Sequence, residues 1–457
     1  MALLPSGSQF RNKFKKIVPW YYPKSEISHL ILQVRARVVG HRHPFVSRVS
    51  SASRHTRLFP RSVVMNSLLN NAVIPKEDPS FDILGGLSQL YLNKARHLER
   101  AYNFNTFYQI PECSESEMLM KPTLLLLGAY STGKTSFIRR LLGRDYIDIH
   151  IGPEPTTDRF NALIHGREEI VVNGTVATAI PHLPFSSLGD FGPGLVNKLS
   201  VTTVDAPILQ HMNIIDTPGV LAGEKQGVMR GYSFAKVARW FAQRSDIILV
   251  FFDCSKTDVS DELKGIIQQL QDFHIRVRCI LNKVDMLSSK ELVRVYGALM
   301  WSIGRIITNA EVTRVYWASN NSDSTLEDAN DSHFINSSLR EDQEALDKVV
   351  LNIHKTSLPR KVGDFFKRMR MLRTHMLLIR HLQKRSALFP WGKETKKMAL
   401  IEQLPQIIDH LSQKHDIPSS DFPSVSFLRS ALMLKKWEET SVDKAHIEAT
   451  TIIWVFT

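Results

Sequence analysis

The sequence predicts an α/β domain with a mainly parallel sheet and an adjoining α-helical domain. The first observation is an alternation of strand-length apolar runs with helical stretches, which is typical of a parallel sheet covered by helices on both faces. The runs lie at 123–127, 212–215, 247–252, 277–281 and 312–317. The second is a glycine-rich loop directly after the first run. The third is a change beyond about residue 340, where apolar residues recur at helical spacing.

The glycine-rich loop fits a nucleotide phosphate-binding loop at every fixed position. It follows an expected strand and leads into an expected helix, which is the context that this motif requires. Its candidate nucleotide-binding residues are Gly128, Tyr130, Ser131, Thr132, Gly133, Lys134, Thr135 and Ser136. In such a loop, backbone N–H groups surround the phosphates, Lys134 supplies a positive charge, and Thr135 offers a hydroxyl to Mg²⁺.

Two further segments stand in the order that a GTPase-type switch domain requires. Asp216-Thr-Pro-Gly219 ends the run at 212–215, so Asp216 can hold Mg²⁺ through a water and the Gly219 N–H can sense a terminal phosphate. The earlier segment 152–158 is polar and stiffened by proline, and its hydroxyls, Thr157 among them, suit a switch that closes on Mg²⁺. Lys134, Thr157 and Asp216 are therefore the catalytic candidates, and Thr135, Thr157 and Asp216 are the metal candidates.

The fourth motif is Asn282-Lys283-Val-Asp285, which follows the run at 277–281. Its Asp is placed to bind a purine edge, and by residue type the motif points to guanine. Met286, directly after it, completes the nucleotide-binding candidates. Four motifs in this order predict a Mg²⁺-dependent nucleoside triphosphatase.

Composition narrows the class of protein. Three cysteines (Cys113, Cys254 and Cys279) make no disulfide framework, which favours a reducing compartment. No uninterrupted apolar run approaches the roughly 18–20 residues of a membrane span. Residues 1–64 hold twelve Lys and Arg against one acid, Glu26, so this leader carries +11 of the net charge of +13. No RNA- or DNA-binding motif accompanies the charge, so we expect no nucleic acid partner.

The expected organisation has five segments. A basic leader and linker covers 1–80, N-terminal helices that pack with the helical domain cover 81–120, the nucleotide-binding domain covers 121–338, the helical domain covers 339–436, and a divergent tail covers 437–457. The leader has three readings: an organelle transit segment, a disordered basic arm for anionic lipid, or sequence upstream of a start at Met65.

The turn between two helices of the helical domain is a candidate membrane contact. Cations flank two aromatic residues there, a composition that suits anionic lipid headgroups. The residues concerned are Lys384, Arg385, Phe389, Trp391, Lys393, Lys396 and Lys397. The alternative is a helical hairpin whose aromatics pack on its own helices while the lysines are solvated.

These motifs carry a family resemblance. The chain resembles the EH domain-containing ATPases, which are dynamin-related membrane-remodelling proteins, over roughly residues 82–436. The stretches that carry the likeness are Gly128–Thr135, Ile151–Asp158, Ile215–Gln226, Arg230–Phe234, Asn282–Asp285, Arg294–Ser302 and Ser420–Pro423.

The resemblance implies properties that spacing does not give. It implies a dynamin-type G domain that binds ATP despite the Asn-Lys-x-Asp motif and hydrolyses it slowly with Mg²⁺. It also implies dimers through the nucleotide domain, with Trp301 as the anchor, and higher oligomers on curved anionic phospholipid membranes. Thr157 would order the attacking water, and Trp391 would be a membrane-inserting aromatic. An ordinary core position is the alternative for Trp301.

Four departures from the family limit what is transferred. No EF-hand-like calcium loop appears, so we expect neither the EH module nor binding of Asn-Pro-Phe peptides. The chain diverges after about Lys436. The family's Lys-Pro-Phe loop is Leu183-Pro-Phe185 here, and its Gly-Ser-Phe-Trp segment is Ala318-Ser-Asn-Asn321, which bears on the base pocket.

The leading hypothesis is a dynamin-like ATPase that assembles on membranes and remodels or tubulates them in endocytic and endosomal trafficking. It would be cytoplasmic and peripheral on endosomal or plasma membranes, unless the leader directs it to an organelle. One alternative is a GTP-binding switch protein that acts through effectors. Another is a nucleotide-binding scaffold or regulator that does not hydrolyse its nucleotide.

Overall fold

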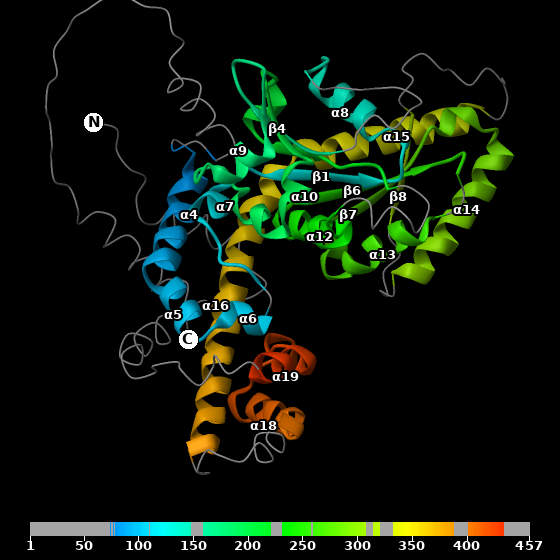
Figure 1. Cartoon of the computed structure of the whole chain (residues 1–457). Helices are drawn as coiled ribbons and strands as arrows, with labels where there is room; N and C mark the ends of the chain where they lie inside the picture. The colour runs from blue at the N-terminus through cyan, green and yellow to red at the C-terminus, as the bar shows by residue number, and fades with distance from the viewer. Residues whose placement is uncertain are drawn as a thin grey trace, which may run out of the picture. The chain divides into compact units, whose positions relative to one another are not determined.

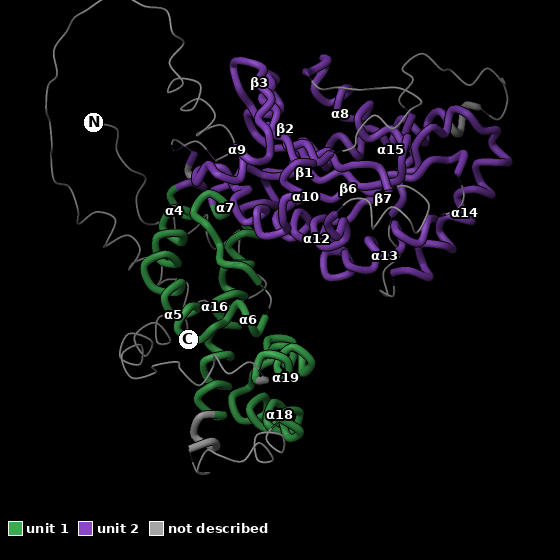
Figure 2. Tube along the Cα trace, viewed as in Figure 1, with its two compact units in different colours: residues 1–57, 82–118, 359–457 green, residues 58–81, 119–358 purple. Residues whose placement is uncertain are grey.

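The computed structural model describes residues 74, 76, 78–108, 110–147, 159–220, 231–256, 259–307, 314–319, 332–387 and 401–433, with backbone only at 79, 332–335, 383–387 and 433. It separates into two compact units, coloured in Figure 2. The unit of 82–118 and 359–457 is called the helical unit, and the unit of 58–81 and 119–358 is called the sheet unit. The five expected segment boundaries stay a prediction.

The sheet unit is built on one eight-stranded sheet with the order β3-β4-β2-β5-β1-β6-β7-β8. Figure 1 labels β4, β1, β6, β7 and β8 of this sheet. The strands are β1 (Thr123–Gly128), β2 (Phe160–His165), β3 (Ile170–Asn173), β4 (Leu199–Val204), β5 (Asn213–Asp216), β6 (Ile247–Asp253), β7 (Val277–Asn282) and β8 (Val315–Ala318). Strands β5, β1, β6, β7 and β8 are parallel, while β2 is antiparallel to β5 and β3 is antiparallel to β4. The predicted α/β fold with a mainly parallel sheet is confirmed. Strands β2, β3 and β4 were not predicted.

The strands of this sheet carry apolar side chains on both faces, and helices cover both faces. Side chains of β1 alternate between two cores, with Leu125 and Leu127 in one and Leu124 and Leu126 in the other. The first core also takes residues of α12 (Phe234–Arg244), α13 (Asp261–Gln269) and α14 (Ser289–Ile306), and the second takes residues of α8 (Lys134–Leu142) and α15 (Ser332–Leu351). Because β5, β1, β6, β7 and β8 are parallel, their carboxyl ends lie at one shared edge, where a ligand site is expected.

Shorter elements complete the sheet unit. They are α9 (Gly174–Ala179), η2 (Ser186–Phe191), α10 (Pro193–Val196), η3 (Pro207–Gln210), η4 (Gln271–Arg276) and η5 (Val284–Met286). Helix α7 (Glu115–Leu119) lies in the helical unit except for its last residue, Leu119.

The helical unit packs helices from two distant parts of the chain against each other. Its described elements are α4 (Pro79–Leu90, from residue 82), the π-helix η1 (Tyr91–Ala95), α5 (Arg96–Ala101), α6 (Phe104–Tyr108), α16 (Ile353–Ala387, from residue 359), α18 (Leu404–His415), η6 (Ser419–Asp421) and α19 (Val425–Met433). The buried ring of His375 on α16 packs against Phe104, Phe107 and Tyr108. None of the helices within the described part of the chain has the length and apolar character needed to cross a membrane.

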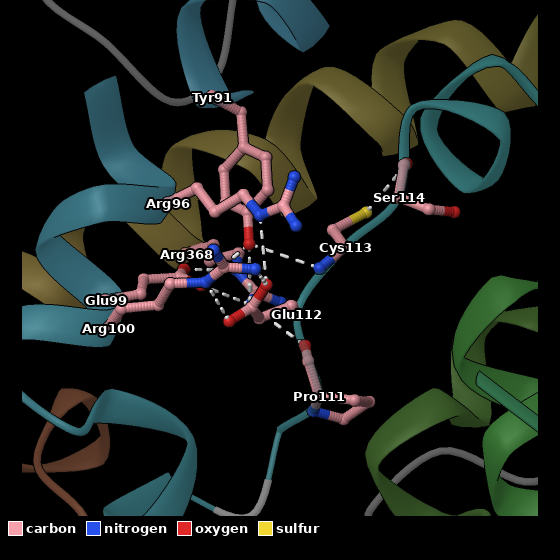
Figure 3. Close-up of polar contacts among 9 residues, drawn as sticks. All are labelled: Tyr91, Arg96, Glu99, Arg100, Pro111, Glu112, Cys113, Ser114 and Arg368. Carbon is pink, nitrogen blue, oxygen red and sulfur yellow. Dashed lines mark hydrogen bonds and ion pairs between the residues drawn. The ribbon is translucent and has the colours of Figure 1, made fainter. Parts of the chain in front are cut away.

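A buried polar network joins α16 to the N-terminal helices (Figure 3). Arg368 donates through Nε and Nη2 to the two carboxylate oxygens of Glu99, at 2.6 and 2.7 Å. Tyr91 donates its hydroxyl to Glu99 at 2.7 Å, and the Arg368 Nη2 also donates to the carbonyl of Pro111 at 2.9 Å. Glu99 is wholly buried, and both oxygens of its carboxylate accept hydrogen bonds.

Candidate nucleotide-binding site

The phosphate-binding loop lies between β1 and α8, as the sequence predicts. Gly133 precedes α8 with a left-handed φ of 90°, and Ser131 also has a left-handed φ, 59°. The Thr132 hydroxyl donates to the Ala129 carbonyl at 2.9 Å, which closes the loop on itself. The loop leads directly into the N-terminus of α8, and a helix N-terminus is a favourable position for a phosphate.

Two glycines allow close approaches at this loop, Gly128 to β6 and Gly219, after β5, to Tyr130. A Cβ on Gly128 would lie 2.6 Å from the Phe251 carbonyl oxygen, and a Cβ on Gly219 would lie 2.7 Å from the Tyr130 Cα. Neither approach leaves room for a side chain. The Val220 N–H donates to the Gly128 carbonyl at 3.1 Å, and the Tyr130 N–H donates to the Val220 carbonyl at 3.0 Å. The predicted phosphate-sensing segment is thus bonded to the loop.

Lys134 is buried at the centre of the site. Its ammonium donates to the carbonyls of Gly128 and Ala129 at 3.2 and 3.0 Å. Burial lowers the pKa of Lys134 to about 8, while the charge of Asp216 acts in the opposite direction. Because carbonyls are neutral partners, a phosphate would stabilise the buried ammonium better than they do.

Thr135 and Asp216 form the group that fits a divalent cation. The Thr135 hydroxyl donates to Asp216 Oδ2 at 3.0 Å. Asp216 Oδ1 is buried and has no hydrogen-bond partner among the described residues. Burial raises the pKa of Asp216, and the charge of Lys134 and the bond from Thr135 oppose the rise. A hydroxyl beside a carboxylate with a spare oxygen is the donor set that Mg²⁺ prefers.

The base end of the site lies where β6 and β7 end. The Asn282 amide donates to the Thr132 carbonyl at 2.8 Å and so ties the motif to the phosphate-binding loop. Asn282 Oδ1 is buried without a partner in the described part of the chain. Lys283 has a left-handed φ of 63°, Asp285 is half-buried and Met286 is exposed. The structure therefore brings the candidates from all three described motifs to one edge of the sheet.

Comparison with known proteins assigns this architecture. A model of the dynamin family matches residues 124–284, and a domain of unknown function (DUF5600) matches 356–451. EH domain-containing protein 1 of Homo sapiens is 39% identical over 366 residues, which are 80% of this chain and 67% of that protein. The protein of the same name from Arabidopsis thaliana is 39% identical over 350 residues, 77% of this chain and 64% of that protein.

The chain belongs to the EH domain-containing protein family. The predicted resemblance is thereby confirmed, together with the dynamin-type nucleotide-binding domain. Among solved structures, an oligomerised bacterial dynamin pair is 15% identical, with a TM-score of 0.36 over 74% of this chain and 52% of that chain.

Some residues that matter by family likeness lie outside the described residues. These are Thr157 and the tip residues Phe389, Trp391, Lys393, Lys396 and Lys397. Lys384 and Arg385 lie in α16 with only their backbone described. The roles given to all of them stay predictions.

Two other positions read from the family are described. Trp301 lies on α14 with 72% of its surface exposed, so within a single chain it is not a core residue. Leu183 and Phe185, which stand where the family has its Lys-Pro-Phe loop, are fully buried in the core of the sheet unit.

Two residues beside the site were missed by the sequence analysis. Asp253 is the buried last residue of β6 and accepts a hydrogen bond from Lys283 at 2.7 Å. The Lys256 ammonium donates to the Tyr130 carbonyl at 3.3 Å. A usable signal existed for Asp253, because an acid directly after a buried apolar run is the same pattern that identified Asp216.

Proposed function

We propose that this member of the EH domain-containing family is a Mg²⁺-dependent nucleoside triphosphatase that binds ATP, hydrolyses it slowly, and couples the nucleotide to self-assembly on membranes. One observation carries the enzymatic half. Among the described residues, the hydrogen-bond acceptors of buried Lys134 are two neutral carbonyls, and buried Asp216 has an oxygen without a hydrogen-bond partner beside the Thr135 hydroxyl. A triphosphate with a divalent cation would pair both charges.

The proposed mechanism depends on positioning and charge neutralisation, and it uses no covalent intermediate. Lys134 would exchange its two carbonyl partners for phosphate oxygens, and Thr135 and Asp216 would hold Mg²⁺. The cation, when bound, supplies neutralisation of the phosphate charge. Thr157 would order the attacking water. With no strong base among these groups, hydrolysis would be slow and would depend on positioning.

Calorimetric titration with ATP and with GTP, each with and without Mg²⁺, tests this proposal. We expect ATP binding that needs the cation, in line with the family likeness. Binding of GTP without ATP would favour a GTP switch acting through effectors, which Asn282 and Asp285 motivate. Binding of ATP with turnover no faster than that of Lys134→Ala would favour a non-hydrolysing scaffold.

The exposed face of α14 supports self-association. Trp301 is 72% exposed and Val293 is 68% exposed, and their spacing of eight residues places them on one side of the helix. Gly297 lies midway between them with nothing within 4 Å of an added Cβ, so the face is open. An exposed tryptophan with an exposed apolar neighbour on the same side of a helix is the kind of residue that dominates protein interfaces. We propose that two copies pair through it.

Sedimentation of the full chain with nucleotide tests the pairing. Trp301→Ala should shift a dimer to a monomer without lowering the melting temperature, because the side chain is exposed. Leu351→Ala is a matched control that should leave the dimer intact, because this apolar side chain is also exposed but lies on α15, which packs on the other core of the sheet unit. A Trp301→Ala protein that still forms dimers would contradict this interface.

The membrane half of the proposal is supported by family membership and by the cationic, aromatic tip of the sequence. Vesicles of phosphatidylcholine with 30% phosphatidylserine, roughly the charge that attracts basic segments, should pellet the protein and raise its ATPase rate. Trp391→Ala combined with Lys396→Glu and Lys397→Glu should abolish pelleting. An ATPase rate that stays constant on vesicles that recruit the protein would rule out assembly-coupled hydrolysis. Endosomal or plasma membrane location, or an organelle address in the leader, would be decided by imaging.

A further inference from the structure

The last residue of β6 is bonded to the lysine that follows β7. The Lys283 ammonium donates to Asp253 Oδ2 at 2.7 Å, and the Asp253 side chain is 1% exposed against 29% for Lys283. Asp253 Oδ1 accepts from the Ser255 N–H at 3.0 Å and from its hydroxyl at 2.7 Å. Both carboxylate oxygens are therefore engaged, which fixes the orientation of the carboxylate.

The hydrogen bonds of Asp253 favour the ionised form of its carboxylate. Burial alone would raise the pKa of Asp253, but the hydrogen bonds from Lys283 and Ser255 outweigh it and the pKa is lowered. Asp253 is thus a charged anchor for Lys283 at neutral pH.

The main chain of Lys283 is held from the same strand end. The Cys254 thiol donates to the Lys283 carbonyl at 2.8 Å, and the Cys254 N–H donates to the Asn282 carbonyl at 3.1 Å. Lys283 has a left-handed φ of 63°, which a residue with a Cβ adopts only when its surroundings hold it there. The end of β6 thereby fixes both the backbone and the ammonium of Lys283 before any ligand binds.

We propose that Asp253 is a positioning residue for the base and ribose end of the nucleotide, acting through Lys283; this rests on the nucleotide binding proposed above. A free lysine side chain loses rotamer freedom when a ligand orders it, and a side chain that is ordered beforehand avoids that loss. The anchor also cancels the charge of Lys283, so this lysine strengthens binding at the base end rather than at the phosphates. Asp253 then affects any ligand that has a base, and it leaves the phosphate site alone.

The experiment compares Asp253→Asn with Asp246→Asn on the full chain. Asp246 directly precedes β6 at the opposite end, is equally buried at 3%, and accepts from the Thr123 N–H at 2.9 Å. Titrations use ATP, GTP and inorganic tripolyphosphate, each with Mg²⁺, and melting temperatures are recorded for all proteins. Tripolyphosphate has no base, so it reports the phosphate site by itself.

We expect Asp253→Asn to weaken whichever purine nucleotide the wild type binds by roughly tenfold, the effect of losing one charge-assisted hydrogen bond. Tripolyphosphate binding should be unchanged, and KM should rise with kcat preserved. Asp246→Asn should lower the melting temperature and leave all three affinities unchanged. Lys283→Met, which keeps the carbon stem without the ammonium, should reproduce the loss if Asp253→Asn fails to fold.

Two results overturn the inference. One is nucleotide affinity within twofold of wild type in Asp253→Asn, or in Lys283→Met where Asp253→Asn does not fold. The other is an equal loss for tripolyphosphate, which would make the effect a general loss of structure. A wild-type protein that binds neither ATP nor GTP would instead refute the proposed function, so the two failures are distinguishable.

Discussion

The two units treat buried charge in opposite ways. In the helical unit, the wholly buried Glu99 is bonded through both oxygens to Arg368 and also to Tyr91 (Figure 3). In the sheet unit, buried Lys134 has two neutral carbonyls for partners, and Asp216 keeps one buried oxygen without a partner among the described residues. Uncompensated buried charge is costly. A ligand can complete the bonding of such groups, and this is the difference between the structural ion pair of Glu99 and the proposed nucleotide site.

The comparison predicts that breaking the helical network costs stability and nothing else. Arg368→Met leaves Glu99 buried without its ion-pair partner, which should lower the free energy of unfolding by about 3–5 kcal/mol. Nucleotide affinity should stay at its wild-type value, because the network lies wholly in the helical unit. Chemical denaturation and calorimetric titration measure the two quantities.

Two further variants sharpen this test. Replacing both partners, as in Arg368→Met with Glu99→Leu, should recover much of the loss because no buried charge remains. Arg96→Ala removes a partly exposed partner of Glu112 and should cost at most about 1 kcal/mol. A nucleotide affinity that falls in Arg368→Met would show that the network also serves the site.

Lys134→Met should have the reverse signature. Nucleotide affinity should fall by at least about a hundredfold, or roughly 2.7 kcal/mol, because the phosphates lose their buried cation. The free energy of unfolding should hold or rise, because methionine removes a charge that burial disfavours. Loss of stability together with loss of binding would mean that Lys134 stabilises the fold. Its buried charge would then have the same structural role as the ion pair of the helical unit, which would contradict the comparison.

The sequence alone predicts the parts of the site that depend on local pattern. Gly128 and Lys134 belong to a contiguous motif, and Asp216 and Asn282 each follow a run of apolar residues that forms a parallel strand. Because parallel strands end at one edge, local patterns suffice to bring these residues together. The exposure of Trp301 could not be read in this way, since α14 has apolar residues on more than one side.

Other features depend on pairing across the chain. Strands β2 and β4 contain polar residues, and these are satisfied across the ladder, as when the Thr202 hydroxyl donates to Asn161 at 3.0 Å in the interior. A search for apolar runs misses such strands. The hydrogen bond between Arg368 and Glu99 joins residues 269 positions apart, so no local sequence pattern predicts it.

The last effect we predict concerns pH, and it again differs between the two units. The pKa of Lys134 is about 8 in the free protein, against an ordinary value of 10.5. Bound phosphates would keep Lys134 protonated, so nucleotide binding should take up a proton above pH 8. Affinity should then fall by up to about tenfold per pH unit, or roughly 1.4 kcal/mol. Calorimetry at pH 8.5 in buffers of different ionisation enthalpy measures the proton uptake directly.

The free energy of unfolding should rise with pH over the range in which nucleotide affinity falls. Between pH 8 and 10.5 the unfolded chain retains the Lys134 proton that the folded chain has lost, so this residue makes the free energy of unfolding rise with pH. Subtracting the profile of Lys134→Met isolates its contribution. The helical network should add no slope there. Burial raises the pKa of Tyr91. Burial lowers the pKa of Arg368, but the hydrogen bonds to Glu99 outweigh burial and the pKa is raised. Both residues therefore keep their protons over this pH range. Affinity that is flat from pH 7.5 to 9.5 would show that the protonation of Lys134 does not change when the nucleotide binds, and would contradict the role proposed for its buried ammonium.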